Sequence, residues 1–371
     1  MNKWTYTTLG KISEIITGPF GSQLHQSDYV EQGIPVVMPQ DIDNRKVNYA
    51  SINYVSNEDA IRLERYKTII NDILYARRGD VEKHAFIKEK DNGVLCGTGC
   101  LRVRITTSEV EPEFISFFLN REETIKWLVT HAVGTNMPNL NTDILSDVPI
   151  AYPLLEEQRK IVQVLNSLDE KIALNSAVND NLSAMAYDIY MHTFFSKKPN
   201  AKLKDILTEA EKSAIQVGEA KTSNGEYPFF TSGATILKWN EPFVDGRNCF
   251  LNTGGNADVK FYVGKAAYST DTWSISAKSE MSDYLYLMLF SIKPELDQKF
   301  FQGTGLKHLQ KPLLKDRPIY VPEKLELEAF NRQVMPMFDI ISENTRENQQ
   351  LTSLRDWLLP MLMNGQATIS D

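Results

Sequence analysis

The sequence carries one long helical pattern twice, at a constant offset of 169 residues (161 to 330, and 189 to 358). In each copy, apolar residues recur at alternating spacings of four and three, which is the heptad spacing of a coiled coil. The matched apolar positions are Ile161, Leu165, Leu168, Ile172, Leu182 and Ile189 in the first copy, and Phe330, Val334, Met337, Ile341, Leu351 and Leu358 in the second. Two helices of the same phase are therefore expected to pair with each other.

Asparagine interrupts both apolar series at the same two places. Asn175 and Asn179 occupy seam positions in the first copy, and Asn344 and Asn348 occupy them in the second. A buried asparagine at a seam position lowers stability but fixes register and partner. We therefore expect antiparallel pairing that brings Asn175 towards Asn348 and Asn179 towards Asn344.

The repeat extends upstream of the helices at the same offset, so each helix follows a duplicated globular part. Asp147–Ile150 matches Asp316–Ile319, and Pro153 matches Pro322 where each globular part ends. The expected domains are a first head over 1–153, a first long helix over 154–197, a second head over 198–322 and a second long helix over 323–371.

Each head has the pattern of a mixed, strand-rich domain, which gives an α+β fold class overall. Short β-prone runs bounded by Gly or Asp predict strands. They cover 34–38, 73–76 and 101–105 in the first head, and 227–231, 249–252 and 260–263 in the second. Helices are expected over 112–130 and 281–300. Pro360 is expected to fray or stop the second long helix.

Bulk composition is that of an ordinary globular chain, with 42% hydrophobic and 24% charged residues over 371 residues. No apolar run is long enough to span a membrane, and the N-terminus lacks a signal-peptide pattern. The three cysteines include no CxxC and are odd in number, so we expect free thiols and a cytoplasmic location.

The net charge of −8 is unevenly distributed along the chain. Residues 198–322 carry 16 basic and 14 acidic residues, whereas residues 323–371 carry 4 basic and 8 acidic residues. Part of the acidic excess therefore lies on the second long helix. The negative net charge of the whole chain is thus compatible with a basic binding face on one of the heads.

No catalytic motif is recognisable in the sequence. It has no Walker A pattern, no GxSxG elbow and no Pro-Pro of the kind found in amino-methyltransferases. Gly97-Thr98-Gly99 is interpreted as a turn rather than a cofactor loop. Cys96 and Cys100 with His84 lack a fourth zinc ligand, so buried thiols are the preferred interpretation. We expect a non-enzymatic chain that has no cofactor and no metal.

Two diverged heads on a constant helical spacer favour a recognition protein that contacts two places on one ligand. Successive major grooves on one face of duplex DNA recur about every 34–36 Å. A helix over 156–194 spans roughly 58 Å at 1.5 Å per residue. The alternative is a scaffold or adaptor whose coiled coil simply associates.

The sequence resembles the specificity subunits of type I restriction-modification systems over essentially its whole length. The runs that carry the resemblance are Leu9–Ile12, Asp72–Gly79, Gly134–Leu140, Asp147–Ile150 and Pro153–Ile161 with its Gln-x-x-Ile entry into the helix. The second copy departs from this pattern, because Lys324–Glu328 lacks the Glu-Gln pair.

This resemblance implies two target recognition domains that each recognise half of an asymmetric, bipartite double-stranded DNA site. It also implies antiparallel helices that dock two adenine-specific methyltransferase subunits, which bind S-adenosylmethionine, and ATP-dependent restriction subunits that join them. A specificity subunit of a related restriction class, or of a methyltransferase-only system, is the alternative.

DNA contacts require Arg, Lys, Asn, Gln, Ser or Thr on exposed loops. The best candidate segment is the basic turn at Arg77, and Gly79 aligns with Gly255 in the second head. The candidate DNA-binding residues are Phe20, Ser22, Gln23, Arg77, Arg78, Lys83 and His84 in the first head, and Thr231, Ser232, Thr253, Asn256, Lys260, Lys307 and His308 in the second. A solvated hairpin turn, or a purely structural turn at the recurrent Gly134 and Gly303 segments, is the alternative.

Overall fold

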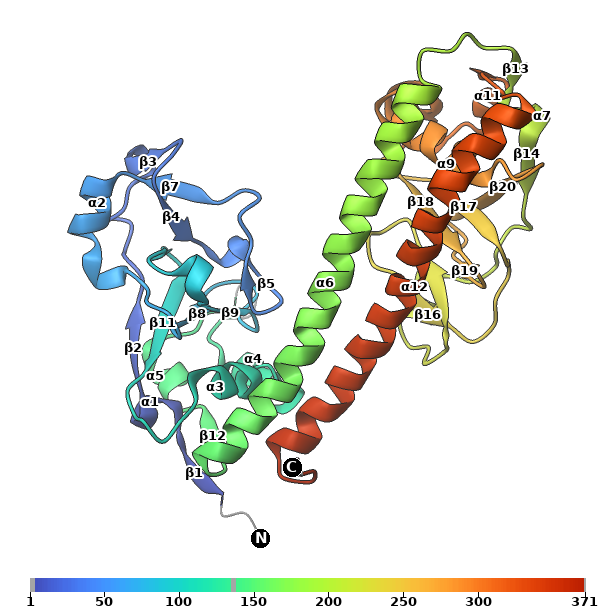
Figure 1. The fold of residues 1–371 in the computed structure, drawn as a ribbon. Coiled ribbons are helices and arrows are strands. Elements are labelled where there is room, and N and C mark those ends of the chain that lie inside the picture. The colour runs from blue at the N-terminus through green and yellow to red at the C-terminus, as the bar shows by residue number, and fades with distance from the viewer. Residues whose placement is uncertain (1–3, 135–137, 370–371) are drawn as a thin grey trace. The chain divides into compact units, whose positions relative to one another are not determined.

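The computed structural model describes residues 4–134 and 138–369. The chain forms two compact units, which are residues 1–169 with 353–371 (unit 1) and residues 170–352 (unit 2). The two long helices are α6 (Leu155–Thr193) and α12 (Lys324–Met363) (Figure 1). The boundary between the units falls within both helices, after residue 169 in α6 and before residue 353 in α12. Within the described residues, no helix is both long and apolar enough to cross a membrane.

Unit 1 contains two four-stranded sheets. The first is antiparallel throughout and has the order β2-β11-β8-β9, and the second has the order β10-β4-β7-β3 with β4 and β10 parallel. The strands are β2 (Ser13–Thr17), β3 (Tyr29–Val30), β4 (Ile34–Val37), β7 (Asn53–Val55), β8 (Ile73–Ala76), β9 (His84–Phe86), β10 (Leu95–Cys96) and β11 (Cys100–Ile105). The strands predicted near residues 34, 73 and 101 are confirmed.

Unit 2 repeats this topology. Its four-stranded sheet has the order β14-β20-β17-β18, and its smaller sheet, β16-β15-β19, again contains one parallel pair, β15 with β19. The strands are β14 (Leu207–Glu209), β15 (Tyr227–Phe230), β16 (Leu237–Trp239), β17 (Arg247–Asn252), β18 (Val259–Val263), β19 (Ala267–Tyr268) and β20 (Thr272–Ala277). The duplication inferred from the sequence is therefore a duplication of fold, and the strands predicted near 227, 249 and 260 are confirmed.

Shorter elements complete the two units. Strand pairs β1-β12 and β13-β23 join the start of each globular part to its end, β5-β6 lies in unit 1 and β21-β22 in unit 2. Their bounds, with those of the short helices, are β1 (Thr5–Thr8), β5 (Ile42–Asp43), β6 (Lys46–Val47), β12 (Pro149–Tyr152), β13 (Ala201–Lys202), β21 (Phe301–Gln302), β22 (His308–Leu309), β23 (Pro318–Ile319), α1 (Leu9–Ile12), α2 (Asn57–Arg62), α5 (Thr142–Ser146), α7 (Leu203–Ile206), α8 (Val217–Ala220) and α11 (Lys311–Lys315).

The two helices expected within the heads exist, but each is broken. The region 112–130 divides into α3 (Pro112–Leu119) and α4 (Glu122–His131), and 281–300 divides into α9 (Ser282–Ser291), α10 (Lys293–Glu295) and a π-helical turn (Leu296–Phe300). Pro294 stands in the first turn of α10, where proline is tolerated because its missing N–H has no partner there.

The long helices are part of the core of each unit rather than a separate spacer. In unit 1, Ile161 and Leu165 of α6 and Leu359 of α12 are buried with Phe114 and Leu145. In unit 2, the buried residues from the helices are Ala186, Tyr190, Leu327, Phe330, Val334 and Phe338, which share one core with β17, β20 and α9. The apolar seam therefore packs on the globular parts as well as between the helices.

The helices run antiparallel where they pair. In unit 2 the Asn175 amide donates to Asn348 Oδ1 at 3.0 Å, and the Asn344 amide donates to Asn179 Oδ1 at 2.8 Å. Residue numbers therefore increase along the first helix while those of its partners decrease along the second. The predicted fold class, with its antiparallel coiled coil, is confirmed. In unit 1 the Arg355 guanidinium of α12 pairs with Asp169 of α6 at 2.9 Å.

The entry to α6 explains the Gln-x-x-Ile motif. Gln158 is fully buried; its amide nitrogen donates to the carbonyls of Glu109 and Pro153, and its Oε1 accepts from the Glu111 N–H at 2.8 Å. These bonds fasten the first turn of the helix to the preceding loop. In the second copy the buried Leu327 stands at this position, so packing replaces the polar fastening.

Prolines precede the first turns of both long helices, but prolines inside α12 do not end that helix. α6 and α12 each begin two residues after a proline, Pro153 and Pro322 respectively. However, Pro360 lies within α12, which continues to Met363, because the residues around it pack in the core of unit 1. Pro336 also lies inside α12 and removes one backbone hydrogen bond, a cost that burial of Val334 and Phe338 offsets.

Candidate DNA interface

In unit 1 the basic turn after β8 is held by the segment that closes the first head. The Leu140 N–H donates to the Arg77 carbonyl at 2.9 Å, and the Gly79 N–H donates to the Pro138 carbonyl at 3.1 Å. Arg78 therefore faces Asn139 in an antiparallel bridge. These two bonds bring the candidate turn and the recurrent closing run together. Thr135, Asn136 and Met137 of that run lie outside the described residues.

Unit 2 contains the same pair of backbone bonds. The Leu309 N–H donates to the Thr253 carbonyl at 3.0 Å, and the Gly255 N–H donates to the Lys307 carbonyl at 2.9 Å, so that Gly254 faces His308. Gly79 and Gly255 have φ values of +77° and +78°, a conformation that favours glycine at both places. We call this two-bond arrangement the backbone clasp. It is constant between the units, whereas the side chains that it positions differ.

A second loop of unit 1 joins the clasp through a glycine turn. The Arg77 N–H donates to the Gly99 carbonyl at 2.7 Å, and the Thr98 hydroxyl donates to the Pro19 carbonyl at 2.9 Å. A Cβ at Gly18 would lie 2.1 Å from the Gly97 carbonyl oxygen, so this approach requires glycine. The loop that carries the candidates Phe20, Ser22 and Gln23 is thereby tied to the basic turn.

The corresponding candidates of unit 2 are tied together by side chains. The Asn252 amide donates to the carbonyls of Ser232 at 2.9 Å and Asn256 at 3.1 Å, and the Lys260 ammonium donates to the Thr231 carbonyl at 2.6 Å. Lys260 is therefore largely occupied in holding the loop. In each unit, these contacts bring several of the candidates, although not all of them, close to one another.

Exposure distinguishes the candidates that DNA can reach. Arg78, Ser22, Gln23, Asn256 and His308 are exposed, whereas Ser232 and Thr253 are half-buried. In addition to Lys260, three candidate cations already have partners within their own unit. The Arg77 Nε donates to the Leu140 carbonyl at 3.2 Å, Lys83 pairs with Asp80 at 2.7 Å and Lys307 pairs with Asp297 at 3.1 Å.

Two candidates are core residues, and these predictions are corrected. The side chain of His84 is only 2% exposed; its Nε2 lies 3.0 Å from the carbonyl and from the hydroxyl oxygen of Ser116. Burial, with the neighbouring Arg45 charge, lowers the pKa of His84 to about 3, so the imidazole is neutral. Thr231 is 5% exposed, and its hydroxyl accepts from the Gly233 N–H. Neither side chain can reach DNA in this conformation.

Two residues of the candidate interface are absent from the candidates chosen from the sequence. Thr98 connects the two loops of unit 1, and Leu306, 66% exposed, projects from the turn between β21 and β22 in unit 2. The Gly-x-Gly patterns around Thr98 and before Leu306 were the available signals. The side-chain contacts were not visible because they join segments far apart in sequence.

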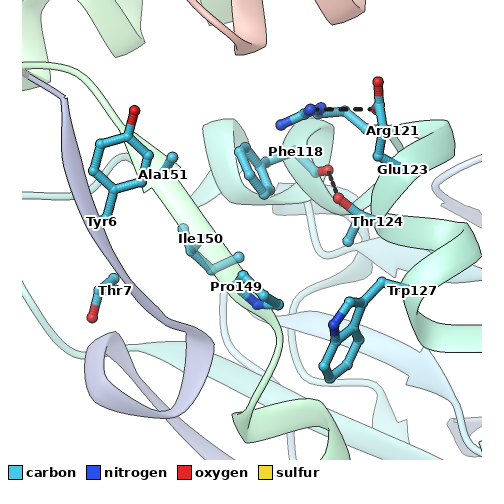
Figure 2. A pocket seen from close by; sticks show the side chains of 10 residues that line it. All are labelled: Tyr6, Thr7, Phe118, Arg121, Glu123, Thr124, Trp127, Pro149, Ile150 and Ala151. Carbon is cyan, nitrogen blue, oxygen red and sulfur yellow. Dashed lines mark hydrogen bonds and ion pairs between the residues drawn. The ribbon is translucent and has the colours of Figure 1, made fainter. Parts of the chain in front are cut away.

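Unit 1 has an apolar cavity of about 350 Å³. Figure 2 shows its lining side chains, which come from strands β1 and β12 on one side and from α4 and the end of α3 on the other. Its lining includes Tyr6, Phe118, Trp127 and Ile150, but none of the DNA-binding candidates. A polar cavity of about 670 Å³ is lined by four cations, Arg65, Lys67, Arg102 and Arg104. Arg102 pairs with Glu14 and Arg104 with Asp72, so much of this charge is already neutralised.

The thiols near His84 do not have the character of metal ligands. Cys96 and Cys100 are buried and free, and burial raises the pKa of Cys96 to about 12, so its thiol stays protonated. Across residues 4–134 and 138–369, no group of three or more His, Cys, Asp or Glu side chains has a geometry that could hold a metal ion.

Two units of one topology, each with a clasped loop cluster and fused to long antiparallel helices, define a two-headed recognition protein. Residues 1–184 and 197–352 match the model of the type I restriction modification DNA specificity domain. The chain therefore belongs to this family, whose members supply DNA sequence specificity within a restriction-modification complex.

Individual relatives are similar over their full length. The chain is 22% identical to the putative type I restriction enzyme MjaX specificity subunit of Methanocaldococcus jannaschii, covering 99% of this chain and 94% of the relative. It is 21% identical to the HindI specificity subunit of Haemophilus influenzae, covering 99% and 100%. The fold is similar to the crystal structure of a type I S subunit from M. genitalium, with a TM-score of 0.65, 15% identity and coverage of 100% and 97%.

Proposed function

We propose that this chain recognises a bipartite, asymmetric site on double-stranded DNA, with the first head contacting one half and the second head the other. The observation that carries this proposal is the backbone clasp, which recurs in both units. A constant frame that presents Arg77 and Arg78 in one unit, but Thr253 and Gly254 in the other, supports two interfaces of one design with different base preferences.

The long helices supply the spacing between the two half-sites. α6 has 39 residues, which corresponds to roughly 58 Å at 1.5 Å per residue. Successive major grooves on one face of duplex DNA recur about every 34–36 Å. The expected division into heads over 1–153 and 198–322, with helices over 154–197 and 323–371, belongs to this proposal.

The helices also dock the catalytic partners. Each unit has large apolar side chains on their exposed faces: Leu174 and Met185 of α6 in unit 2, and Leu354 and Trp357 of α12 in unit 1 are 43–60% exposed. Such residues mark protein interfaces when they gather on one element. We propose two adenine-specific methyltransferase subunits as the partners, with ATP-dependent restriction subunits joining them in the cytoplasm.

In this proposal the chain itself is not an enzyme. S-adenosylmethionine and ATP are bound by the partners, and this chain contributes DNA contacts and docking surfaces. The buried, protonated thiols and the neutral His84 offer no activated nucleophile or base in unit 1.

The test is reconstitution with the methyltransferase. We expect the purified chain to turn over no S-adenosylmethionine and to bind DNA tightly and specifically only in the complex. A Trp357→Ala variant should weaken assembly, whereas Lys126→Ala, at an exposed position of α4, should not. Turnover of S-adenosylmethionine by the isolated chain would overturn the proposal.

A further inference from the structure

Among the described residues, each unit has an exposed, large apolar side chain on a loop of its candidate interface. Phe20 is 59% exposed in unit 1, and Leu306 is 66% exposed in unit 2. Their neighbours in these loops are polar and exposed, including Gln23 near Phe20 and His308 near Leu306. A single exposed apolar residue is ordinary on a protein surface. The position and rigidity of these two residues, rather than their exposure alone, carry the argument.

The loop around Phe20 is closed by its own hydrogen bonds. The Gln23 N–H donates to the Phe20 carbonyl at 2.8 Å, and the Phe20 N–H donates to Gln23 Oε1 at 3.2 Å. That same Oε1 accepts from the Tyr66 hydroxyl at 2.8 Å, and Pro19 is fastened by Thr98. The backbone that carries the ring is therefore fixed on both sides while the ring itself points to solvent.

The turn around Leu306 is constrained at its two ends. Gly303 has a φ of +149°, and a Cβ there would lie 2.7 Å from the Leu306 carbonyl oxygen, so the turn closes only with glycine. The next residue, Lys307, accepts the clasp bond from Gly255 and pairs through its ammonium with Asp297 at 3.1 Å. Leu306 is thus held next to the clasp of unit 2.

Rigid apolar tips surrounded by hydrogen-bonding side chains match a known way of binding DNA. Phenylalanine and leucine side chains inserted between base pairs partly unstack a step and kink the duplex. Polar contacts alongside them fix the register. A tip that is ordered before binding loses little conformational freedom when it inserts.

We propose that Phe20 and Leu306 are wedges, each inserting at one base step of the half-site that its head contacts. This inference rests on the proposed function and adds a mode of recognition to it. Specificity would then depend partly on how easily that step unstacks, since pyrimidine–purine steps deform most readily. The two wedges come from different loops of the repeated fold, because Phe20 precedes the clasp residues of unit 1 in sequence whereas Leu306 directly precedes Lys307 of the clasp in unit 2.

The experiment uses the complete complex with its methyltransferase and duplexes carrying 2-aminopurine at successive positions, avoiding the methylated adenines. 2-Aminopurine fluorescence rises when the base is unstacked. We expect a rise at one step in each half-site. Phe20→Ala should abolish the rise in the first half-site only, and Leu306→Ala in the second only, each with a roughly tenfold loss of affinity.

Matched controls separate a wedge from other roles. Ile61→Ala on α2 and Leu313→Ala on α11 remove comparably exposed side chains elsewhere and should change neither fluorescence nor affinity. Phe20→Leu should retain most of the rise. Unchanged fluorescence in the alanine variants, while the wild-type complex binds its site, would overturn the wedge alone. Loss of methyltransferase assembly in these variants would also overturn it, in favour of a protein contact. A wild-type complex without sequence preference would instead overturn the proposed function.

Discussion

At the scale of single residues, Arg78 and His84 illustrate how burial determines whether a side chain is available to a ligand or packs in the core. Arg78 is exposed and held by its backbone opposite Asn139, which leaves its guanidinium open to a ligand. His84, six residues later, is buried against Ser116. Two residues of the same basic segment therefore have opposite environments, since Arg78 is exposed to solvent and His84 is buried in the core.

Arg78→Ala should lower the affinity of the assembled complex for its DNA. If the guanidinium contacts a base edge, the loss is about 1–3 kcal/mol and one base pair of the site becomes less discriminated. If it contacts phosphate, affinity falls across all sequences and the salt dependence weakens by about one ion. Binding isotherms at several salt concentrations distinguish these cases, with Lys126→Ala on α4 as the control. Unaltered affinity for every sequence would remove Arg78 from the interface.

His84 should make stability depend on pH. Its pKa is lowered to about 3 in the folded state, first by burial and then by Arg45, whereas the unfolded side chain has its usual value of 6.5. Between these two pKa values, the imidazole of His84 is protonated in the unfolded state but neutral in the folded state. The contribution of His84 is complete above pH 6.5 and is lost as the pH falls from there towards 3, with a slope of up to about 1.4 kcal/mol per pH unit.

Denaturant unfolding between about pH 5 and pH 7 measures this slope. His84→Gln should flatten it, whereas His308→Gln, at an exposed position, should follow the wild type. A slope that is the same for His84→Gln and the wild type would mean that another group is responsible for the loss of stability.

At the scale of elements, the asparagines explain why two helices with a repeated pattern pair in one register. Asn175 is 3% exposed and donates to both Asn348 and Glu347, the latter at 2.6 Å. Shifting the register by one heptad would separate the buried Asn175 amide from both of these partners. The register therefore follows from the cost of an unpaired buried polar group.

Asn175→Leu alone should destabilise unit 2 by about 1–3 kcal/mol, because Asn348 loses its partner. The double variant Asn175→Leu with Asn348→Leu should recover that stability through apolar packing, but should populate additional self-associated species because the register is less specified. Chemical denaturation and sedimentation velocity measure the two effects. Asn181→Leu, the same substitution at an exposed position of α6, is the matched control. An Asn175→Leu variant as stable as the wild type would contradict this role.

At the scale of the whole molecule, the structural features that could be predicted from the sequence are those marked by a short repeating pattern of apolar and polar residues. The heptads and the paired asparagines predicted both long helices and their antiparallel pairing, and alternating β-prone runs predicted the main strands. The burial of His84 and Thr231, and the breaks between α3 and α4, depend on contacts between distant segments. A local pattern contains no signal for them. The backbone clasp was predicted only in part. Gly79 and Gly255 were aligned in the sequence, but their hydrogen-bond partners, the carbonyls of Pro138 and Lys307, were not predicted.

The central claim is that the two heads recognise DNA independently. The most direct measurement replaces residues 1–150 with the first head of another family member and maps the methylated sequences in cells that carry the reconstituted system. The account predicts that one half of the recognition site changes while the other half and the spacing stay the same, because the clasp and the helices of unit 2 are untouched. A replacement that alters both half-sites together would contradict independent recognition.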